Sequence, residues 1–162
     1  MFRVLVICTG NTCRSPMAEV ILRSVLPADW GDQVDVGSAG TGAADGNPAT
    51  PFAVATAAAH GLDLRAHRSR ALTPRLVREA DLILAMEPRH VEWAGSLAPD
   101  AKDRIRLVTE QSAESGAPSS GVSDPIGGTP EEYDDTFHRI RSHLLRWVPL
   151  IREEIERQEG VR

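Results

Sequence analysis

The stretch "VLVICTGNTCRSPMAEVILRSVL", residues 4–26, contains both cysteines of the chain and joins two different hydrophobic patterns. Residues 2–7 form an apolar run of strand length, which is typical of a strand covered on both faces of a parallel sheet. After the polar segment 8–15, Pro16 suits the first turn of a helix, and apolar residues then recur at helical spacing. The stretch therefore predicts a buried strand, a tight loop and a helix.

The rest of the chain alternates in the same way. We predict three further strands, at 33–40, 81–86 and 104–109. Helices are predicted at 51–60, 73–80 and 88–97, and from about 133 to 155. Pro149 should kink or break the last helix. A loop rich in Ser, Gly and Pro spans about residues 110–130. With no internal repeat or domain linker, we expect one α/β domain over residues 1–162 with a parallel sheet.

Composition excludes several classes of protein. The chain has 162 residues and a net charge of −5, so a broad basic surface for nucleic acid is not expected. No apolar run is long enough to span a bilayer and no signal peptide is evident, so we expect a cytoplasmic protein without membrane contact. Two cysteines are too few for a disulfide framework or a structural zinc site. No cofactor and no metal are expected, because the histidines form no metal-ligand spacing and should be structural or exposed: His60, His90, His138 and His143.

The segment 8–15 joins the end of a strand to the start of a helix, where open α/β sheets bind ligands. Successive backbone N–H groups and the helix N-terminus favour an anion there, and Gly10 should let the backbone curl. Arg14 can grip two phosphate oxygens, and Cys8 should ionise easily in this field and act as a nucleophile. Ser15 can donate a hydrogen bond to the thiolate. The expected phosphate-binding residues are Thr9, Gly10, Asn11, Thr12, Cys13, Arg14 and Ser15.

The spacing of Cys8 and Arg14 follows the pattern C-x5-R, which is weak alone and much stronger between a buried strand and a helix. The plainer interpretation is a buried cysteine and a solvated arginine. The stretch "VICTGNTCRSPMAE" resembles the active-site loop of the low-molecular-weight protein-tyrosine phosphatases. The resemblance continues at "SAGT" (38–41), "ADLILAM" (80–86) and "DPIGG" (124–128).

This resemblance implies a three-layer α/β fold, with a twisted four-stranded parallel sheet and helices on both faces. It also implies hydrolysis of phosphorylated proteins through a phosphocysteine, with inorganic phosphate as product and inhibitor. Cys8 would be the nucleophile, Arg14 the phosphate clamp and Asp124 the general acid, which protonates the leaving group. Ser38 and His67 would support the loop through Asn11, although His67 could equally be a surface histidine.

Cys13 is close enough in sequence to trap an oxidised Cys8 as a disulfide, or it simply fills space behind the loop. Two positions depart from the tyrosine phosphatase pattern. Thr12 stands where tyrosine-specific loops carry a larger aliphatic residue, and Ile126 stands where many members have an aromatic one. The loop 41–48 also lacks an aromatic wall for a phenol ring.

Thr12 and the segment "ATPFAVATA" (49–57) are similar to the bacterial protein-arginine phosphatases, so we favour phosphoarginine as substrate, with phosphotyrosine as the alternative. Ile126 departs from that subfamily as well. An arsenate reductase is less favoured because it generally needs a further cysteine, and a non-catalytic phosphate-binding module would need neither Cys8 nor Asp124. The sequence predicts no oligomeric state.

Overall fold

The computed structural model describes residues 1–111 and 120–160 and shows the predicted α/β architecture. Strand β1 (Phe2–Cys8) lies between β2 (Val34–Gly40) and β3 (Leu82–Ala85), and β4 (Ile105–Leu107) follows beyond β3. Each neighbouring pair is parallel, so all four strands end at the same edge of the sheet. The predicted four-stranded parallel sheet is confirmed.

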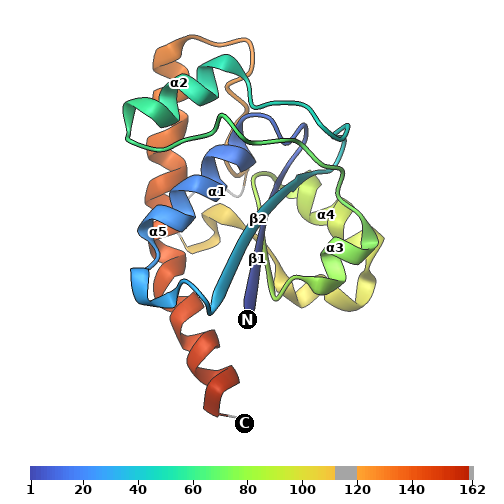
Figure 1. Cartoon of the computed structure of the whole chain (residues 1–162). Helices are drawn as coiled ribbons and strands as arrows, with labels where there is room; N and C mark the ends of the chain where they lie inside the picture. The colour runs from blue at the N-terminus through green and yellow to red at the C-terminus, as the bar shows by residue number, and fades with distance from the viewer. Residues whose placement is uncertain (112–119, 161–162) are drawn as a thin grey trace.

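Helices cover both faces of the sheet and make a three-layer fold (Figure 1). On one face lie α1 (Arg14–Val25), α2 (Pro51–Ala59) and α5 (Pro130–Gly160). The other face carries α3 (Pro74–Glu79) and α4 (Pro88–Leu97). Side chains alternate along β1, so Val4 and Val6 join the first core while Leu5 and Ile7 join the second. This double burial explains why residues 2–7 form an almost uninterrupted apolar run.

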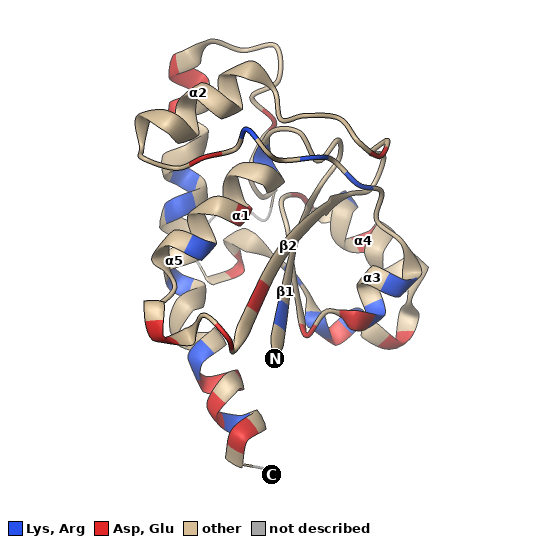
Figure 2. Ribbon diagram, in the orientation of Figure 1, with Lys and Arg blue, Asp and Glu red and all other residues tan. Residues whose placement is uncertain are grey.

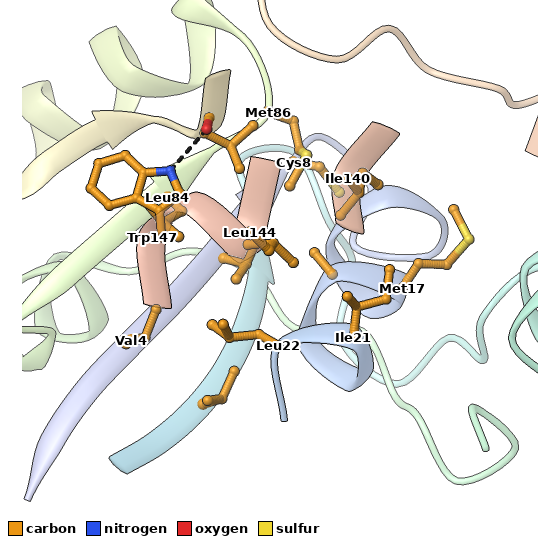
Figure 3. Packing of buried hydrophobic residues seen from close by; sticks show 14 of the residues in the cluster. Val4, Cys8, Met17, Ile21, Leu22, Leu84, Met86, Ile140, Leu144 and Trp147 are labelled. Carbon is orange, nitrogen blue, oxygen red and sulfur yellow. Dashed lines mark hydrogen bonds between the residues drawn. The ribbon is translucent and has the colours of Figure 1, made fainter. Parts of the chain in front are cut away.

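The larger core holds α1 and α5 against the sheet (Figure 3). Met17, Ile21 and Leu22 of α1 are fully buried, as are Ile140 and Leu144 of α5. Trp147 belongs to the same layer, and its indole Nε1 donates a hydrogen bond to the Val108 carbonyl at 2.8 Å. Each buried aliphatic side chain stabilises the fold by roughly 1.5–3 kcal/mol. This packing fixes α1, and with it the loop that precedes α1.

Most predicted boundaries are confirmed. Thr73 caps α3 by accepting a hydrogen bond from the Leu76 N–H, and Pro74 is the first helical residue. The fourth strand is shorter than the predicted 104–109. It ends at Leu107, because the chain turns into a 3-10 helix, η3 (Val108–Gln111). Two short 3-10 helices were not predicted, η1 (Ala28–Trp30) and η2 (Pro99–Arg104).

We predicted a kink or a break at Pro149, and the helix does not break there. Helix α5 continues through this residue to Gly160. Pro149 cannot donate to the Leu145 carbonyl, but both residues are exposed, so water can satisfy that oxygen. Trp147 and Ile151 are buried on the opposite side of the helix. Their packing outweighs the lost hydrogen bond and carries the helix across the proline.

The late irregular segment is described only in part. Of the predicted loop 110–130, residues 112–119 lie outside the described residues, and residues 121–129 contain neither helix nor strand. Basic and acidic residues are interspersed along α5 rather than separated by sign (Figure 2). Among the described helices, none combines the length and the apolar character that crossing a membrane requires.

Candidate active site

The segment 8–15 forms a tight loop between β1 and α1, and Asn11 holds its centre. Asn11 is fully buried and has a positive φ of 55°, a conformation that Asn tolerates better than most residues. Its Nδ2 donates to the Ser15 hydroxyl at 2.8 Å and to the Ser38 hydroxyl at 2.9 Å. Its Oδ1 accepts from the backbone N–H of Arg70 at 3.0 Å. Three neighbouring segments thus stabilise one strained residue.

His67 also contacts Asn11, because its Nε2 donates a hydrogen bond to the Asn11 backbone carbonyl at 2.7 Å. The structure therefore places both expected supporting residues, Ser38 and His67, in contact with Asn11. The role given to Gly10 is different from the expected one, because the left-handed turn is made by Asn11 and not by Gly10. Close approach requires glycine instead at Gly40, where a Cβ would lie 2.4 Å from the Thr9 carbonyl oxygen.

Cys8 is the last residue of β1 and is only 2% exposed. Its Sγ lies 2.9 Å from the Ser15 hydroxyl. Burial raises the pKa of the Cys8 thiol, although the Ser15 hydroxyl and the Arg14 charge act in the opposite direction. This direction contradicts the easily ionised thiol expected from the sequence. The physical reason is that desolvation of the buried thiol outweighs the hydrogen bonds from Ser15 and Asn11 and the charge of Arg14.

Arg14 is buried, and its guanidinium is surrounded by acceptors. Nη1 donates to the Glu87 carboxylate at 2.5 Å and to the Val122 carbonyl at 2.8 Å. Nη2 lies 3.4 Å from Asp124 Oδ2, while the buried Nε has no hydrogen-bond partner among the described residues. Partial burial raises the pKa of Glu87, but hydrogen bonds from Arg14 and Arg89 outweigh it and hold that pKa below its usual value.

Glu87 and His90 were not among the predicted site residues. His90 Nδ1 accepts the Glu87 backbone N–H at 3.1 Å, so its Nε2 carries the proton and donates to the Thr9 hydroxyl at 2.8 Å. Burial lowers the pKa of His90 to about 4. His90 thus supports the loop as a neutral imidazole. Both residues could have been suspected from their place in the sequence. The segment "EPRH" (87–90) directly follows the carboxyl end of a predicted strand, where open α/β sheets bind ligands.

The segment that carries Asp124 rests on the end of β3. Gly121 has a φ of +79°, and a Cβ there would lie 1.9 Å from the Met86 carbonyl oxygen, so only glycine fits. The next residue, Val122, donates its N–H to that same oxygen at 2.7 Å. Asp124 is one-third exposed, and its Oδ1 accepts the Ile126 N–H at 3.1 Å. The Ile126 side chain is 61% exposed.

Thr12 and Cys13 form the side of the loop that faces α2. The Thr12 carbonyl accepts the Thr50 N–H at 2.9 Å, which ties the start of α2 to the loop. Within the described residues the Thr12 hydroxyl has no hydrogen-bond partner. Cys13 Sγ lies 3.4 Å from the Thr50 hydroxyl and 3.3 Å from the Tyr133 hydroxyl. Cys8 and Cys13 are both free thiols, and their side chains have different partners.

The edge of the sheet thus brings together a buried thiol, a buried arginine and a partly exposed carboxyl group. Arg14 Nε is unpaired and Nη2 is only weakly held, so the guanidinium can accept an oxyanion in place of Asp124. A tetrahedral anion on Arg14 would lie at the N-terminus of α1, where the helix dipole favours negative charge. Transfer of a group from this anion to the thiol is the chemistry that the arrangement allows.

Comparison with known proteins agrees with this geometry. Residues 3–159 match the sequence profile of the family described as low molecular weight phosphotyrosine protein phosphatase. The chain belongs to this family. It is therefore a protein phosphatase, and the resemblance seen in the sequence is confirmed. Family membership implies phosphorylated protein substrates.

Similar proteins include both tyrosine phosphatases and an arginine phosphatase. The chain is 34% identical to the low molecular weight protein-tyrosine-phosphatase Wzb of Salmonella typhi, over 94% of this chain and 95% of that protein. The structure of Wzb from Escherichia coli K30 in complex with sulphate has a TM-score of 0.80 at 32% identity and covers 93% and 99% of the two chains. The YwlE arginine phosphatase of Geobacillus stearothermophilus has a TM-score of 0.83 at 30% identity and covers 95% of each.

One expectation about the histidines is wrong. His60 and His138 do come together with a carboxylate, that of Asp134, and the ligand atoms of the three side chains lie within 4.8 Å of one another. Asp134 and His138 are one helical turn apart on α5, and this spacing was visible in the sequence. The contribution of His60 was not, because it depends on how α2 packs against α5.

Proposed function

We propose that this phosphatase removes the phosphoryl group from phosphoarginine in proteins. Cys8 acts as the nucleophile, Arg14 holds the phosphoryl oxygens, and Asp124 is the general acid. The loop residues Thr9–Ser15 surround the phosphoryl group, with backbone N–H groups and the helix dipole as further positive charge. Support comes from the 2.9 Å Cys8–Ser15 contact and from the open positions on the Arg14 guanidinium.

The reaction has two displacements at phosphorus. The Cys8 thiol first loses its proton to solvent, and the resulting thiolate attacks the phosphorus. An S–P bond forms and the P–N bond breaks, while the Asp124 carboxyl proton goes to the departing guanidino nitrogen. Water then attacks the phosphocysteine, and the Asp124 carboxylate takes a proton from that water. The S–P bond breaks, the Ser15 hydroxyl donates to the returning thiolate, and inorganic phosphate leaves. Inorganic phosphate is therefore expected to inhibit by occupying the same loop.

The observation that carries the proposed arginine specificity is the hydroxyl of Thr12, which has no hydrogen-bond partner among the described residues. A guanidinium has N–H donors in its plane, and the Thr12 oxygen can accept one of them next to the phosphoryl site. An aliphatic residue there would offer apolar contact to a phenol ring but no acceptor. The two groups of relatives named above support both substrates, so Thr12 carries the choice between them.

A set of Thr12 variants tests this specificity. Thr12→Val removes the hydroxyl at nearly constant shape, Thr12→Ser keeps it, and Thr12→Ile adds an apolar wall. We measure kcat/KM on matched peptides that carry phosphoarginine or phosphotyrosine. Wild type and Thr12→Ser should prefer phosphoarginine, while Thr12→Val should lose roughly 10- to 100-fold on phosphoarginine alone, the strength of a hydrogen bond to a charged group. A wild-type preference for phosphotyrosine, or a ratio that Thr12→Val leaves unchanged, would refute the arginine specificity.

One observation favours phosphotyrosine as the second candidate. Phe52 is 44% exposed at the start of α2, and its ring meets the Tyr133 ring edge-on at 5.5 Å. Because the Thr50 N–H donates to the Thr12 carbonyl, Phe52 lies at the start of the helix that contacts the loop, and Tyr133 packs on it from α5. The exposed face of Phe52 could pack on a phenol ring. Under this alternative, Phe52→Ala should reduce kcat/KM for phosphotyrosine peptides much more than for phosphoarginine peptides.

A further inference from the structure

Outside the active site, the side chains of His60, Asp134 and His138 converge between two helices. His60 caps the C-terminus of α2, whereas Asp134 and His138 lie one turn apart on α5. The Asp134 carboxylate stands between the two imidazoles. His60 Nε2 lies 2.8 Å from Oδ1, and His138 Nε2 lies 3.4 Å from Oδ2. Each imidazole contacts a different oxygen of this carboxylate, and the ligand atoms of the three side chains lie within 4.8 Å of one another.

We propose that these three side chains form a binding site for a divalent transition-metal ion such as Zn²⁺, which joins α2 to α5. Two imidazoles and a carboxylate are a ligand set that suits Zn²⁺, Co²⁺ or Ni²⁺ and does not suit Mg²⁺ or Ca²⁺. The proposal concerns a site distinct from Cys8 and Arg14, and it is independent of the substrate specificity.

The distances fit a tetrahedral ion with little movement. Two ligand atoms that each lie about 2.1 Å from a tetrahedral ion are about 3.4 Å apart. The separation of 3.4 Å between His138 Nε2 and Asp134 Oδ2 already has this value. His60 Nε2 lies 2.8 Å from the other oxygen, Oδ1, so binding of the ion through Oδ2 needs a rotation of the His60 or Asp134 side chain. The proton that now lies between His60 and Asp134 would be displaced by the ion, as metal binding to imidazole requires.

The surroundings hold His60 in place and leave space for further ligands. The His60 ring stacks on the Phe137 ring, with centroids 4.2 Å apart and an angle of 9° between the planes. Phe137 is itself buried in the core, so it is a fixed support. Both histidines line a cavity of about 330 Å³, which gives room for water to complete the coordination.

Metal binding should stabilise the fold, because the site exists only when α2 is packed on α5. An ion at a concentration about a hundred times its Kd should raise Tm by roughly 5–10 °C in a domain of this size. The ion would hold the far end of α2, whose near end contacts the phosphate loop through Thr50.

Isothermal titration calorimetry with Co²⁺ tests the site on the full chain. Wild type should bind one ion at this site. The absorption spectrum of the Co²⁺ complex, recorded separately, should be that of nitrogen and oxygen ligands and should lack the intense near-ultraviolet bands of thiolate ligands. His60→Gln and His138→Gln should each weaken binding at least about tenfold, a loss that corresponds to about 1.4 kcal/mol. His143→Gln, a change to another histidine of α5, is the matched control and should leave affinity unchanged. Mg²⁺ should not bind.

Two outcomes would overturn the proposal. One is the absence of Co²⁺ and Zn²⁺ binding at this site, and the other is binding that persists unchanged in both His60→Gln and His138→Gln. The metal-free Tm of each variant shows whether it is folded. If either variant is unstable, Asp134→Asn replaces it, and anomalous diffraction from a Zn²⁺-soaked wild-type crystal must show a peak between the three side chains. A peak only at the cysteines would also refute the site.

Discussion

At the scale of single residues, Arg14 determines the electrostatics of the active edge. It is a buried cation whose charge is shared by Glu87, the Val122 carbonyl and, more weakly, Asp124. A buried cation without such acceptors would cost several kcal/mol. These acceptors also reduce the stabilisation that Arg14 can give to a Cys8 thiolate. Glu87 thus holds Arg14 in place, and we expect it also to weaken the effect of Arg14 on the Cys8 thiol.

We predict that Glu87→Gln lowers the pKa of Cys8. The substitution removes a negative charge beside Arg14 and leaves the guanidinium less compensated, which favours the thiolate. The pH dependence of Cys8 alkylation by iodoacetamide, read by peptide mass spectrometry, should shift its midpoint to lower pH. Glu92→Gln, a change to an exposed acid on α4, should leave the midpoint in place. Identical midpoints in wild type and Glu87→Gln would show that Glu87 does not control the thiol.

Asp124 gives the second prediction at this scale. Its side chain is one-third exposed and contacts Arg14 at 3.4 Å, so it can move onto a bound leaving group. Asp124→Asn should slow hydrolysis of an aryl phosphate with a poor leaving group by roughly a hundred- to ten-thousand-fold. A substrate whose leaving group departs unaided should lose much less. Equal losses on the two substrates would give Asp124 a structural role instead.

At the scale of elements, the features best predicted from the sequence are those that depend on residues adjacent in the chain. The strand β1, the cap at Thr73 and the start of α2 at Pro51 each carry their own signal in adjacent residues. Contacts between distant segments carry no such signal. His90 reaches Thr9 across 81 residues, and its burial follows only from the placement of α4 beside β1. The loop 8–15 was predictable because its signal lies in adjacent residues. Glu87 and His90 were missed because their contacts with the loop come from a distant segment of the chain.

At Pro149 the packing of neighbouring buried residues of α5 outweighs the low helix propensity of proline. This leads to a prediction about the stability of α5. A proline inside a helix is about 3 kcal/mol less favourable than alanine. Because Pro149 and Leu145 are exposed, restoring the hydrogen bond between them should not disturb the core. We expect Pro149→Ala to raise the free energy of unfolding by about 1–3 kcal/mol in urea titrations. Ser142→Ala, at another exposed position of α5, should change it by only a few tenths. A destabilised Pro149→Ala would refute this account of α5.

At the scale of the whole molecule, the sheet lies between the two cores, and the candidate active site lies at the edge where all strands end. Residues after β1, β2 and β3 converge there, so the loop has rigid support from three directions. Asn11 receives contacts from Ser38, His67 and Arg70, while Arg14 receives them from residues 87, 122 and 124. Strain at Asn11 is thus maintained by the global fold, which explains why loop geometry could not be derived from the segment 8–15 alone.

This coupling predicts that the stability of the whole domain depends on pH through His90. The folded protein holds His90 neutral with a pKa of about 4, whereas the unfolded chain has the ordinary value of 6.5. Between these values the unfolded state binds the extra proton, so stability falls as pH falls. Between pH 7 and pH 5 this difference amounts to about 2 kcal/mol. Carboxylates with lowered pKa, such as Glu87, lose their contribution only below about pH 4.5, outside this range.

Urea unfolding at pH 7, 6 and 5 measures the effect. His90→Asn keeps an acceptor near the Glu87 N–H but cannot titrate, so most of the pH dependence should disappear even if the variant is less stable at pH 7. Burial also lowers the pKa of His143, so His143 too should make the protein less stable as pH falls. The variant His143→Gln measures the contribution of His143 to this pH dependence. If His90→Asn loses as much stability as wild type between pH 7 and pH 5, the proton enters elsewhere. His90 would then be charged in the folded protein, and its donation to Thr9 would no longer require the neutral imidazole inferred from the Glu87 contact.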